Sequence, residues 1–209
     1  MIASGAGKNP NNASDTGWDA AWNTSLRADA ATLEVALKCD ATYQTWAGVA
    51  GTAEAESLPI NCINWFEAEA FCIWDGGRLP TEAEWNYAAA GGKAQRMFPW
   101  GSTAPDCSYA NFSGCAGTVN RVGSESTKGD GLYGQSDLAG NVWEWTQDWG
   151  SPYANPCSNC VNSTASPTRV PRGGSFYHDA TFLLSSYRDG FSPSGRRSYY
   201  GARCARNAP

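Results

Sequence analysis

The chain has 209 residues, of which 42% are hydrophobic and 12% aromatic, so it is long and apolar enough to bury a core as one domain. Its net charge of −5 and its lack of any Lys/Arg run argue against nucleic-acid binding. No apolar run approaches the roughly 20 residues of a membrane helix, so no membrane span is predicted.

Eight cysteines accompany a single histidine, His178, which limits the metal sites that this chain can build. A zinc ribbon needs two C-x-x-C pairs, and only Cys157 and Cys160 have that spacing. An even cysteine count instead favours disulfides in an oxidising compartment, either extracellular, cell-surface or periplasmic. Because no signal peptide opens the sequence, we expect a fragment of a longer exported protein, truncated at its N-terminus.

The first sixty residues predict little regular structure. Residues 1–17 are rich in Gly, Asn, Ser and Pro and predict a loop, and residues 39–59 predict another. Between them, the Ala-rich residues 18–37 predict one or two short helices.

Two capped helices follow. Asn64 is an N-cap residue with Glu67 as its capping-box partner, and the helix that they begin ends at Gly76-Gly77. Thr81 and Glu84 form a second capping box, and Gly91-Gly92 ends that helix.

The C-terminal half predicts turns and loops around a short strand. A loop from Asp137 enters a strand at residues 142–146, in which Trp143 and Trp145 share one face. Ten Trp and 23 Gly favour a compact, loop-rich α+β domain over a helical bundle.

Residues 172–206 contain the candidate ligand-binding residues of the chain. Its start, Arg172-Gly-Gly-Ser-Phe176, predicts a tight backbone turn leading into a strand, and residues 201–206 predict a closing strand. Between them, aromatic and polar residues mix with Gly, Ser and Pro, which is typical of a recognition surface. An ordinary hairpin with a long loop explains the same composition. The candidate ligand-binding residues are Tyr177, His178, Asp179, Phe182, Tyr187, Asp189, Phe191, Tyr199 and Tyr200, with Arg188, Arg196 and Arg197 at the rim.

A hydrolase triad of Ser175, His178 and Asp179 is conceivable from residue types alone. We disfavour it because the three residues lie too close in sequence for triad geometry. A surface contact is the preferred role for His178.

Several segments together resemble the formylglycine-generating enzyme family, also called the sulfatase-modifying-factor family. They include RLPTEAEW at 78–85, GNVWEW at 140–145, RGGSF at 172–176 and GARCAR at 201–206, and the match runs from 59 to 206. The resemblance implies a single domain over residues 1–209 with an α+β, C-type-lectin-like formylglycine-generating-enzyme fold, loop-rich with little regular secondary structure.

The family's oxidases hold copper with two cysteines after the RGGS motif, and these positions read His178 and Leu183 here. Leucine ligates no metal and one imidazole makes a poor copper site, so copper is not expected. A related branch uses non-haem iron held by several histidines, which a chain with one histidine cannot supply.

A further branch of the fold carries no catalysis: the variable proteins of diversity-generating retroelements display a mutable C-terminal surface. The crowd of Tyr, His, Asp, Ser and Phe at 177–200 resembles such a surface. The favoured hypothesis is therefore a non-catalytic, extracellular binding module with an unknown protein or glycan ligand. The alternatives are a sulfatase-activating oxidase with unusual ligands and a structural domain of a larger surface protein.

The resemblance also implies a calcium site and a disulfide. The calcium ligands would be the Asp137 and Glu144 carboxylates with the Gly140 and Val142 carbonyls. A second family site would use Asn111 and Phe112, but its remaining ligands fall in a loop that differs here. The implied disulfide joins Cys72 to Cys204. By proximity alone, Cys39–Cys62, Cys107–Cys115 and Cys157–Cys160 complete the set, out of about 105 possible pairings.

Overall fold

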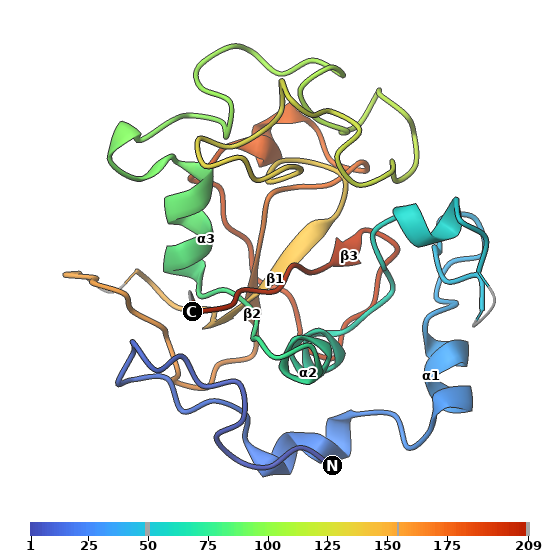
Figure 1. The fold of residues 1–209 in the computed structure, drawn as a ribbon, viewed down its shortest axis with the longest axis vertical. Coiled ribbons are helices and arrows are strands. Elements are labelled where there is room, and N and C mark those ends of the chain that lie inside the picture. The colour runs from blue at the N-terminus through green and yellow to red at the C-terminus, as the bar shows by residue number, and fades with distance from the viewer. Residues whose placement is uncertain (49–50, 154, 208–209) are drawn as a thin grey trace.

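The computed structural model describes residues 1–48, 51–153 and 155–207. Its α-helices are α1 (Ala30–Ala36), α2 (Trp65–Trp74) and α3 (Glu82–Ala89), and its strands are β1 (Trp143–Trp149), β2 (Arg169–Arg172) and β3 (Tyr200–Gly201). Short 3-10 helices lie at Ala20–Ser25 (η1), Ala55–Ser57 (η2), Gly92–Ala94 (η3) and Ala180–Leu183 (η4). The small sheet lies at the centre, with α2 and α3 beside it and long loops above it (Figure 1). This is the expected loop-rich α+β architecture.

Both predicted capped helices are confirmed. The Asn64 side chain accepts from the Glu67 amide at 2.9 Å, and Glu67 accepts in return from the Asn64 amide at 3.2 Å. Thr81 and Glu84 make the same reciprocal pair at 3.1 and 2.9 Å. Each box satisfies backbone donors that a helix start leaves free, which explains why the local sequence determines where α2 and α3 begin.

The sheet has the order β2-β1-β3. Strand β1 pairs antiparallel with β2, Glu144 opposite Arg172, and parallel with β3, Trp143 opposite Tyr200. Pro171 lies in β2, an edge strand, where its missing N–H costs no ladder hydrogen bond.

The strand predicted to follow Arg172 instead precedes it. Strand β2 ends at Arg172, and Gly173 and Gly174 then adopt φ of +98° and +74°. Two successive residues with positive φ cannot continue a strand, so the chain turns there. A Cβ on Gly174 would also come within 3.0 Å of the Phe182 carbonyl oxygen, so the turn needs glycine for space as well. The predicted closing strand is likewise shorter than 201–206, since β3 covers only Tyr200–Gly201.

Tryptophans form the centre of the core. Trp18, Trp65, Trp143 and Trp145 are each about 1% exposed and belong to one hydrophobic cluster that α2 and β1 share. The guanidinium of Arg169, itself buried, lies 3.5 Å from the ring centroids of both Trp65 and Trp149. Stacking between two indoles lets this cation lie in the interior, because the ring faces attract positive charge.

All eight cysteines form disulfides in the expected pairs: Cys39–Cys62, Cys72–Cys204, Cys107–Cys115 and Cys157–Cys160. The second ties α2 to the segment after β3 across 132 positions of sequence. Four disulfides indicate an oxidising, extracytoplasmic environment.

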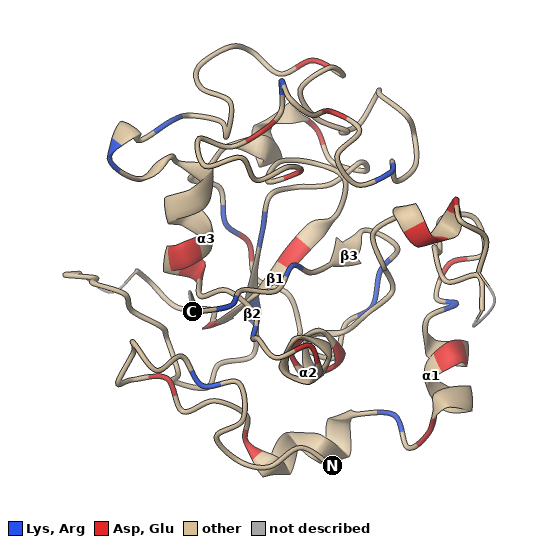
Figure 2. Cartoon of the chain, in the orientation of Figure 1, with Lys and Arg blue, Asp and Glu red and all other residues tan. Residues whose placement is uncertain are grey.

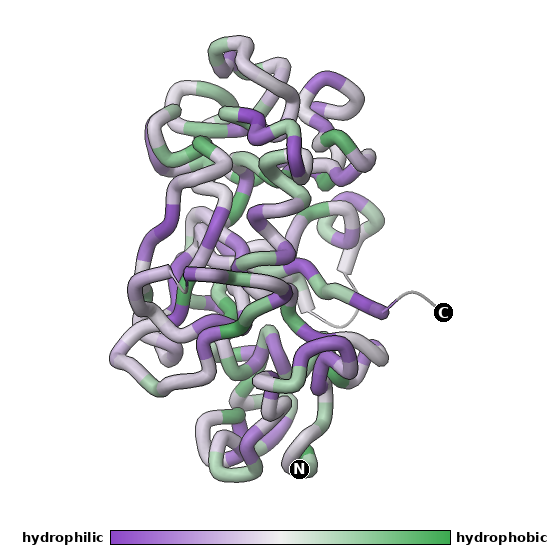
Figure 3. The backbone as a smooth tube through the Cα atoms, turned by 90° about the vertical axis from the view of Figure 1, so that its left-hand side faces the viewer, coloured by the Kyte–Doolittle hydropathy of each residue, from purple (hydrophilic) through white to green (hydrophobic). Residues whose placement is uncertain are grey.

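Charged and hydrophobic residues are spread along the whole described chain. Lys and Arg are scattered among Asp and Glu along the chain (Figure 2). Hydrophobic and hydrophilic segments are interspersed along the tube (Figure 3), and none of the described helices is long and apolar enough to cross a membrane.

Candidate functional site

The candidate binding residues gather around one buried side chain, Trp143 of β1. The ring centroids of four of them lie 5.5 to 6.1 Å from that of Trp143: His178, Phe182, Tyr187 and Phe191. The ring centroid of Tyr199 lies 5.1 Å from that of His178, and the Tyr177 ring stacks on that of Tyr199. We call these six residues, Tyr177, His178, Phe182, Tyr187, Phe191 and Tyr199, the aromatic face. Trp143 is the centre of the face, although its sequence pattern predicts only that it shares one side of a strand with Trp145.

Backbone hydrogen bonds tie the aromatic face and its neighbours to the scaffold at several points. The Trp143 amide donates to the Tyr199 carbonyl and the Ser113 amide donates to the His178 carbonyl, each at 2.9 Å. Phe191 exchanges two backbone hydrogen bonds with Arg169, at 2.8 and 3.0 Å. Further carbonyls that accept from the scaffold belong to Ser185, Pro193, Arg197 and Ser198. These hydrogen bonds form whichever side chains residues 177–200 carry. Side chains anchor the segment as well, since Arg188 pairs with Glu82, Arg196 pairs with Glu67, and Leu183 is in the core.

The residues of the aromatic face and its neighbours differ in exposure. Tyr177 is 62% exposed and its ring lies 5.4 Å from that of Tyr199, nearly parallel at 12°. Asp179 is also exposed, whereas His178, Phe182, Tyr187, Asp189, Phe191 and Tyr199 are half-buried. Tyr200 departs from the prediction: it is 8% exposed, because it lies in β3 stacked on Phe191 and against the edge of Trp145.

His178 has a defined hydrogen-bonding state. The Trp143 indole Nε1, which can only donate, lies 3.2 Å from His178 Nδ1, and the Ser175 hydroxyl lies 2.7 Å from the same nitrogen. Nδ1 is therefore the acceptor and Nε2 carries the proton. Burial lowers the pKa of His178, although Asp189 and Asp179 oppose that shift. The imidazole is thus a neutral, oriented surface group at pH 7.

The Ser175–His178–Asp179 combination does not form a hydrolytic triad. Ser175 touches His178 but is fully buried, so its hydroxyl faces no substrate. Asp179 instead accepts from the Thr181 amide at 2.9 Å and from its hydroxyl, which caps η4. A triad needs its carboxylate on the other imidazole nitrogen, and this carboxylate is used elsewhere.

The two positions that match the family's copper cysteines lie in different environments. His178 lies in the aromatic face, whereas Leu183 is 1% exposed and packs against Phe98 and Ala110. All eight cysteines are in disulfides, so none supplies the thiolate that copper requires. These donors do not fit a copper centre.

Two of the four expected calcium ligands, the Glu144 and Asp137 carboxylates, are hydrogen-bonded to protein groups. Both oxygens of Glu144 accept from the Arg203 guanidinium at 2.6 Å, and one also accepts from the Trp85 indole at 2.6 Å. Asp137 accepts from the Gly123 amide at 2.7 Å. A calcium ion at Glu144 would have to displace Arg203, so the residues as arranged do not fit calcium.

The groups of the family's second calcium site, which the sequence did not favour here, are hydrogen-bonded within the protein too. Asn111 is 1% exposed, and its side chain donates to the Thr118 carbonyl at 2.7 Å. The Phe112 carbonyl accepts from the Cys115 amide at 3.0 Å. Both groups support the loop that the Cys107–Cys115 disulfide closes.

We predict that calcium does not stabilise this chain. A chelator should shift the melting temperature by less than about 1 °C, because only a ligand of the native state raises stability by mass action. Glu144→Gln should lower the melting temperature equally with calcium and with chelator, since it removes the ion pair with Arg203. Differential scanning calorimetry measures both; a calcium-dependent rise in wild type that the variant loses would establish the ion site.

Comparison with known proteins agrees with the motifs and the fold. The model of the sulfatase-modifying factor enzyme 1-like domain family matches residues 15–208. The chain belongs to this family. It is 33% identical to the formylglycine-generating enzyme of Mus musculus, over 70% of this chain and 44% of that protein. It is 36% identical to the hercynine oxygenase of Mycolicibacterium smegmatis, over 70% of this chain and 37% of that protein. The chain thus spans less than half the length of these two relatives.

Solved structures of the same fold include two that align over most of this chain. Treponema denticola variable protein 1 aligns with a TM-score of 0.62 and 24% identity over 81% of this chain and 78% of that one. PvdO from Pseudomonas aeruginosa aligns with a TM-score of 0.60 and 22% identity over 70% and 60%. At such identity the likeness concerns the fold, which is the expected formylglycine-generating-enzyme fold.

Proposed function

We propose that this family member is a non-catalytic binding module whose aromatic face contacts a protein or glycan partner outside the cell. The observation that carries the proposal is the environment of His178 and Leu183, the two positions that match the copper-binding cysteines of the family's oxidases. Leu183 is part of the core, and the Nδ1 atom of His178 is occupied by Trp143 and Ser175. The residues at the positions of the family's copper-binding cysteines therefore serve packing and hydrogen bonding in this chain.

The composition of the aromatic face supports a role in recognition. Tyrosine offers large contact area with few rotatable bonds, so it loses little entropy on binding. Tyr177 and Tyr199 are already stacked, and His178 is oriented by two hydrogen bonds, so these groups are preorganised before a partner arrives. Exposed Asp179 adds a charged contact at the edge of the face.

The proposal predicts that exposed positions of the face carry binding but not stability. Binders for the wild-type domain are selected from a displayed peptide library and a glycan array, which also distinguishes the two partner classes. Tyr177→Ala combined with Asp179→Asn should weaken the selected interaction at least about tenfold, as expected where exposed contact residues contribute to binding. The melting temperature should fall by less than about 2 °C, because Tyr177 is 62% exposed and asparagine keeps the η4 cap that Asp179 supplies.

Trp74→Ala is the matched control, since Trp74 is an 80% exposed aromatic residue on α2 rather than on the face. It should leave the selected interaction unchanged. Equal loss in both variants would show that exposed aromatics bind without regard to the face. Copper-dependent oxygen consumption with a cysteine-containing sulfatase peptide would contradict the non-catalytic proposal directly.

A further inference from the structure

Two carboxylates, Asp179 and Asp189, lie beside the rings of the aromatic face. Asp179 directly follows His178, and Asp189 lies two residues after Tyr187. Burial raises the pKa of Tyr187, and both carboxylates raise it further. Burial lowers the pKa of His178, and the same two carboxylates oppose that shift. Since each charge acts on both rings, the two carboxylates border the same part of the face.

Each of these carboxylates keeps one oxygen without a hydrogen bond to any described residue. The Oδ1 atom of Asp179 accepts from the hydroxyl and the amide of Thr181, which lower the pKa of Asp179. The Oδ1 atom of Asp189 accepts from the Gly190 amide at 2.8 Å. Asp179 is an exposed residue, and the Oδ2 atom of Asp189 is not buried. Both Oδ2 atoms are therefore left to accept from a partner.

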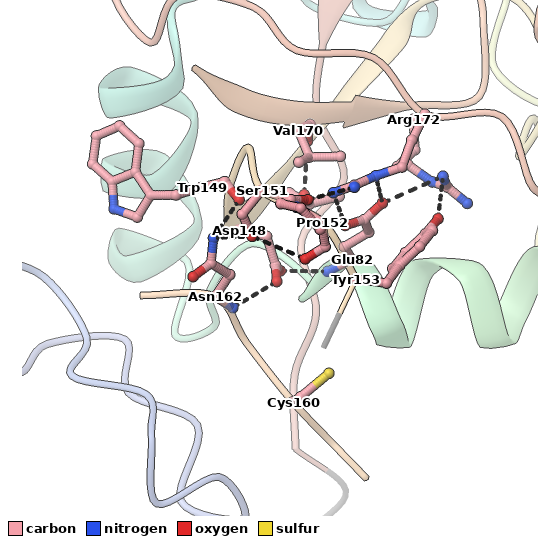
Figure 4. Close-up of polar contacts among 12 residues, drawn as sticks. Glu82, Asp148, Trp149, Ser151, Pro152, Tyr153, Cys160, Asn162, Val170 and Arg172 are labelled. Carbon is pink, nitrogen blue, oxygen red and sulfur yellow. Dashed lines mark hydrogen bonds and ion pairs between the residues drawn. The ribbon is translucent and has the colours of Figure 1, made fainter. Parts of the chain in front are cut away.

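The half-buried arginines near the face in sequence are paired with other carboxylates. Glu82 accepts from Arg188 twice, at 2.7 Å. The same carboxylate lies 3.4 Å from Arg172, within the group of polar contacts drawn in Figure 4. The Arg196 guanidinium pairs with both oxygens of Glu67. Neither Arg188 nor Arg196 thus forms an ion pair with the two carboxylates of the face.

Arg197 is the exposed arginine of residues 177–200. Its guanidinium donates to the Arg196 carbonyl at 3.1 Å. Burial raises the pKa of Tyr200, and the Arg197 charge lowers it, so this cation acts beside β3. The part of the face around His178 and Tyr187 therefore has more negative than positive charge.

Aromatic rings add a second attraction for positive charge. Tyr177 is 62% exposed, and its ring is stacked on that of Tyr199. The faces of tyrosine rings attract cations. A guanidinium is planar, so it stacks on such a ring while its N–H groups donate to carboxylate oxygens. Exposed tyrosine beside free carboxylate oxygens thus matches this one cation in both respects.

We propose that the aromatic face recognises a partner protein through an arginine side chain of that partner. This inference rests on the binding function proposed above and selects a protein over a glycan, because neutral and acidic sugars carry no guanidinium. Arginine fits better than lysine, since an ammonium group cannot stack as a plane or donate in a fork. Asp179 and Asp189 would accept the hydrogen bonds, and Tyr177 would supply the ring.

The test begins with a displayed peptide library, selected in parallel on wild type, on the double variant Asp179→Asn/Asp189→Asn and on Asp29→Asn. Asparagine keeps the oxygen that accepts from the backbone, so each variant loses charge and retains its fold. Asp29 is the matched control, because it is exposed and accepts from the amide and hydroxyl of Thr32 at the start of α1. Arginine should be enriched over the unselected library on wild type and on Asp29→Asn, and not on the double variant.

A single selected peptide then gives the size of the effect. Replacing its enriched arginine by citrulline keeps the shape and removes the charge. This change should weaken binding to wild type about tenfold to hundredfold, as expected for a lost hydrogen bond to a charged group. Binding to the double variant should change by less than about fivefold. Calorimetric titration measures both, and circular dichroism checks that every variant is folded.

Several results would overturn the inference. Peptides that bind without arginine enrichment, or a citrulline peptide that binds wild type equally well, would show that no cation is recognised. Enrichment that persists on the double variant would place the cation elsewhere on this acidic domain. Binding of glycans but of no peptide would sink this inference and leave the proposed function standing. If neither class binds, the proposed function fails as well.

Discussion

Replacing Cys72 and Cys204 together by alanine is expected to lower the free energy of unfolding by about 5 kcal/mol, the largest effect that we predict. The bond spans 132 positions, so its loss frees most of the chain to expand in the unfolded state. It also releases α2 from the segment that follows β3. Urea unfolding followed by tryptophan fluorescence measures the change.

The Cys157–Cys160 disulfide provides the control, because it closes only 3 positions of sequence. The same entropic argument gives about 2 kcal/mol for that pair. Equal losses in the two double variants would show that loop length does not determine their contribution.

Glu82→Gln is expected to cost about 3–5 kcal/mol, because it leaves a buried guanidinium without its counter-charge. The Arg172 side chain is fully buried, and the Arg188 side chain is 24% exposed. Glutamine keeps the size of the side chain, so the loss reports the charge rather than a cavity. Thermal and urea unfolding of the variant give the value.

Asp75→Asn is the matched control, since Asp75 pairs with Arg206 where the side chains are 39% and 58% exposed. Water screens that pair, so its loss should cost less than about 1 kcal/mol. A small cost at Glu82 as well would mean that Arg172 finds sufficient compensation in the Ser185 carbonyl, 2.6 Å away.

Local signals in the sequence predicted the elements that depend on neighbours in the chain. The capping boxes at Asn64 and Thr81 involve residues only three positions apart, so α2 and α3 could be placed from sequence. The family motifs supplied the fold and the Cys72–Cys204 pair. The turn at Gly173-Gly174 was also predicted from sequence, but not that the strand lies before it. That strand, β2, is identified only by its pairing with β1.

Long-range pairing explains what sequence analysis missed. The family resemblance places Glu144 in a calcium site, and nothing local in the sequence shows that Arg203, 59 positions later, binds both of its oxygens. Tyr200 was assigned to the surface together with its neighbour Tyr199, because both belong to the same aromatic stretch. Pairing with β1 instead places the Tyr200 side chain in the core. The pocket of about 810 Å³ between α3 and residues 148–153 and 157–162 draws on distant parts of the chain, so no single stretch of sequence contains it.

The backbone anchoring of residues 177–200 has a consequence for how this domain can evolve. A carbonyl oxygen is the same whichever side chain its residue carries, so the bonds at His178 and Tyr199 survive most substitutions there. The exposed side chain of Tyr177 contributes little to the packing beneath it, and the cap that Asp179 gives η4 can equally come from asparagine, serine or threonine. At such exposed positions, selection for a stable fold and selection for a new partner act on different atoms, and a lineage can change one without losing the other.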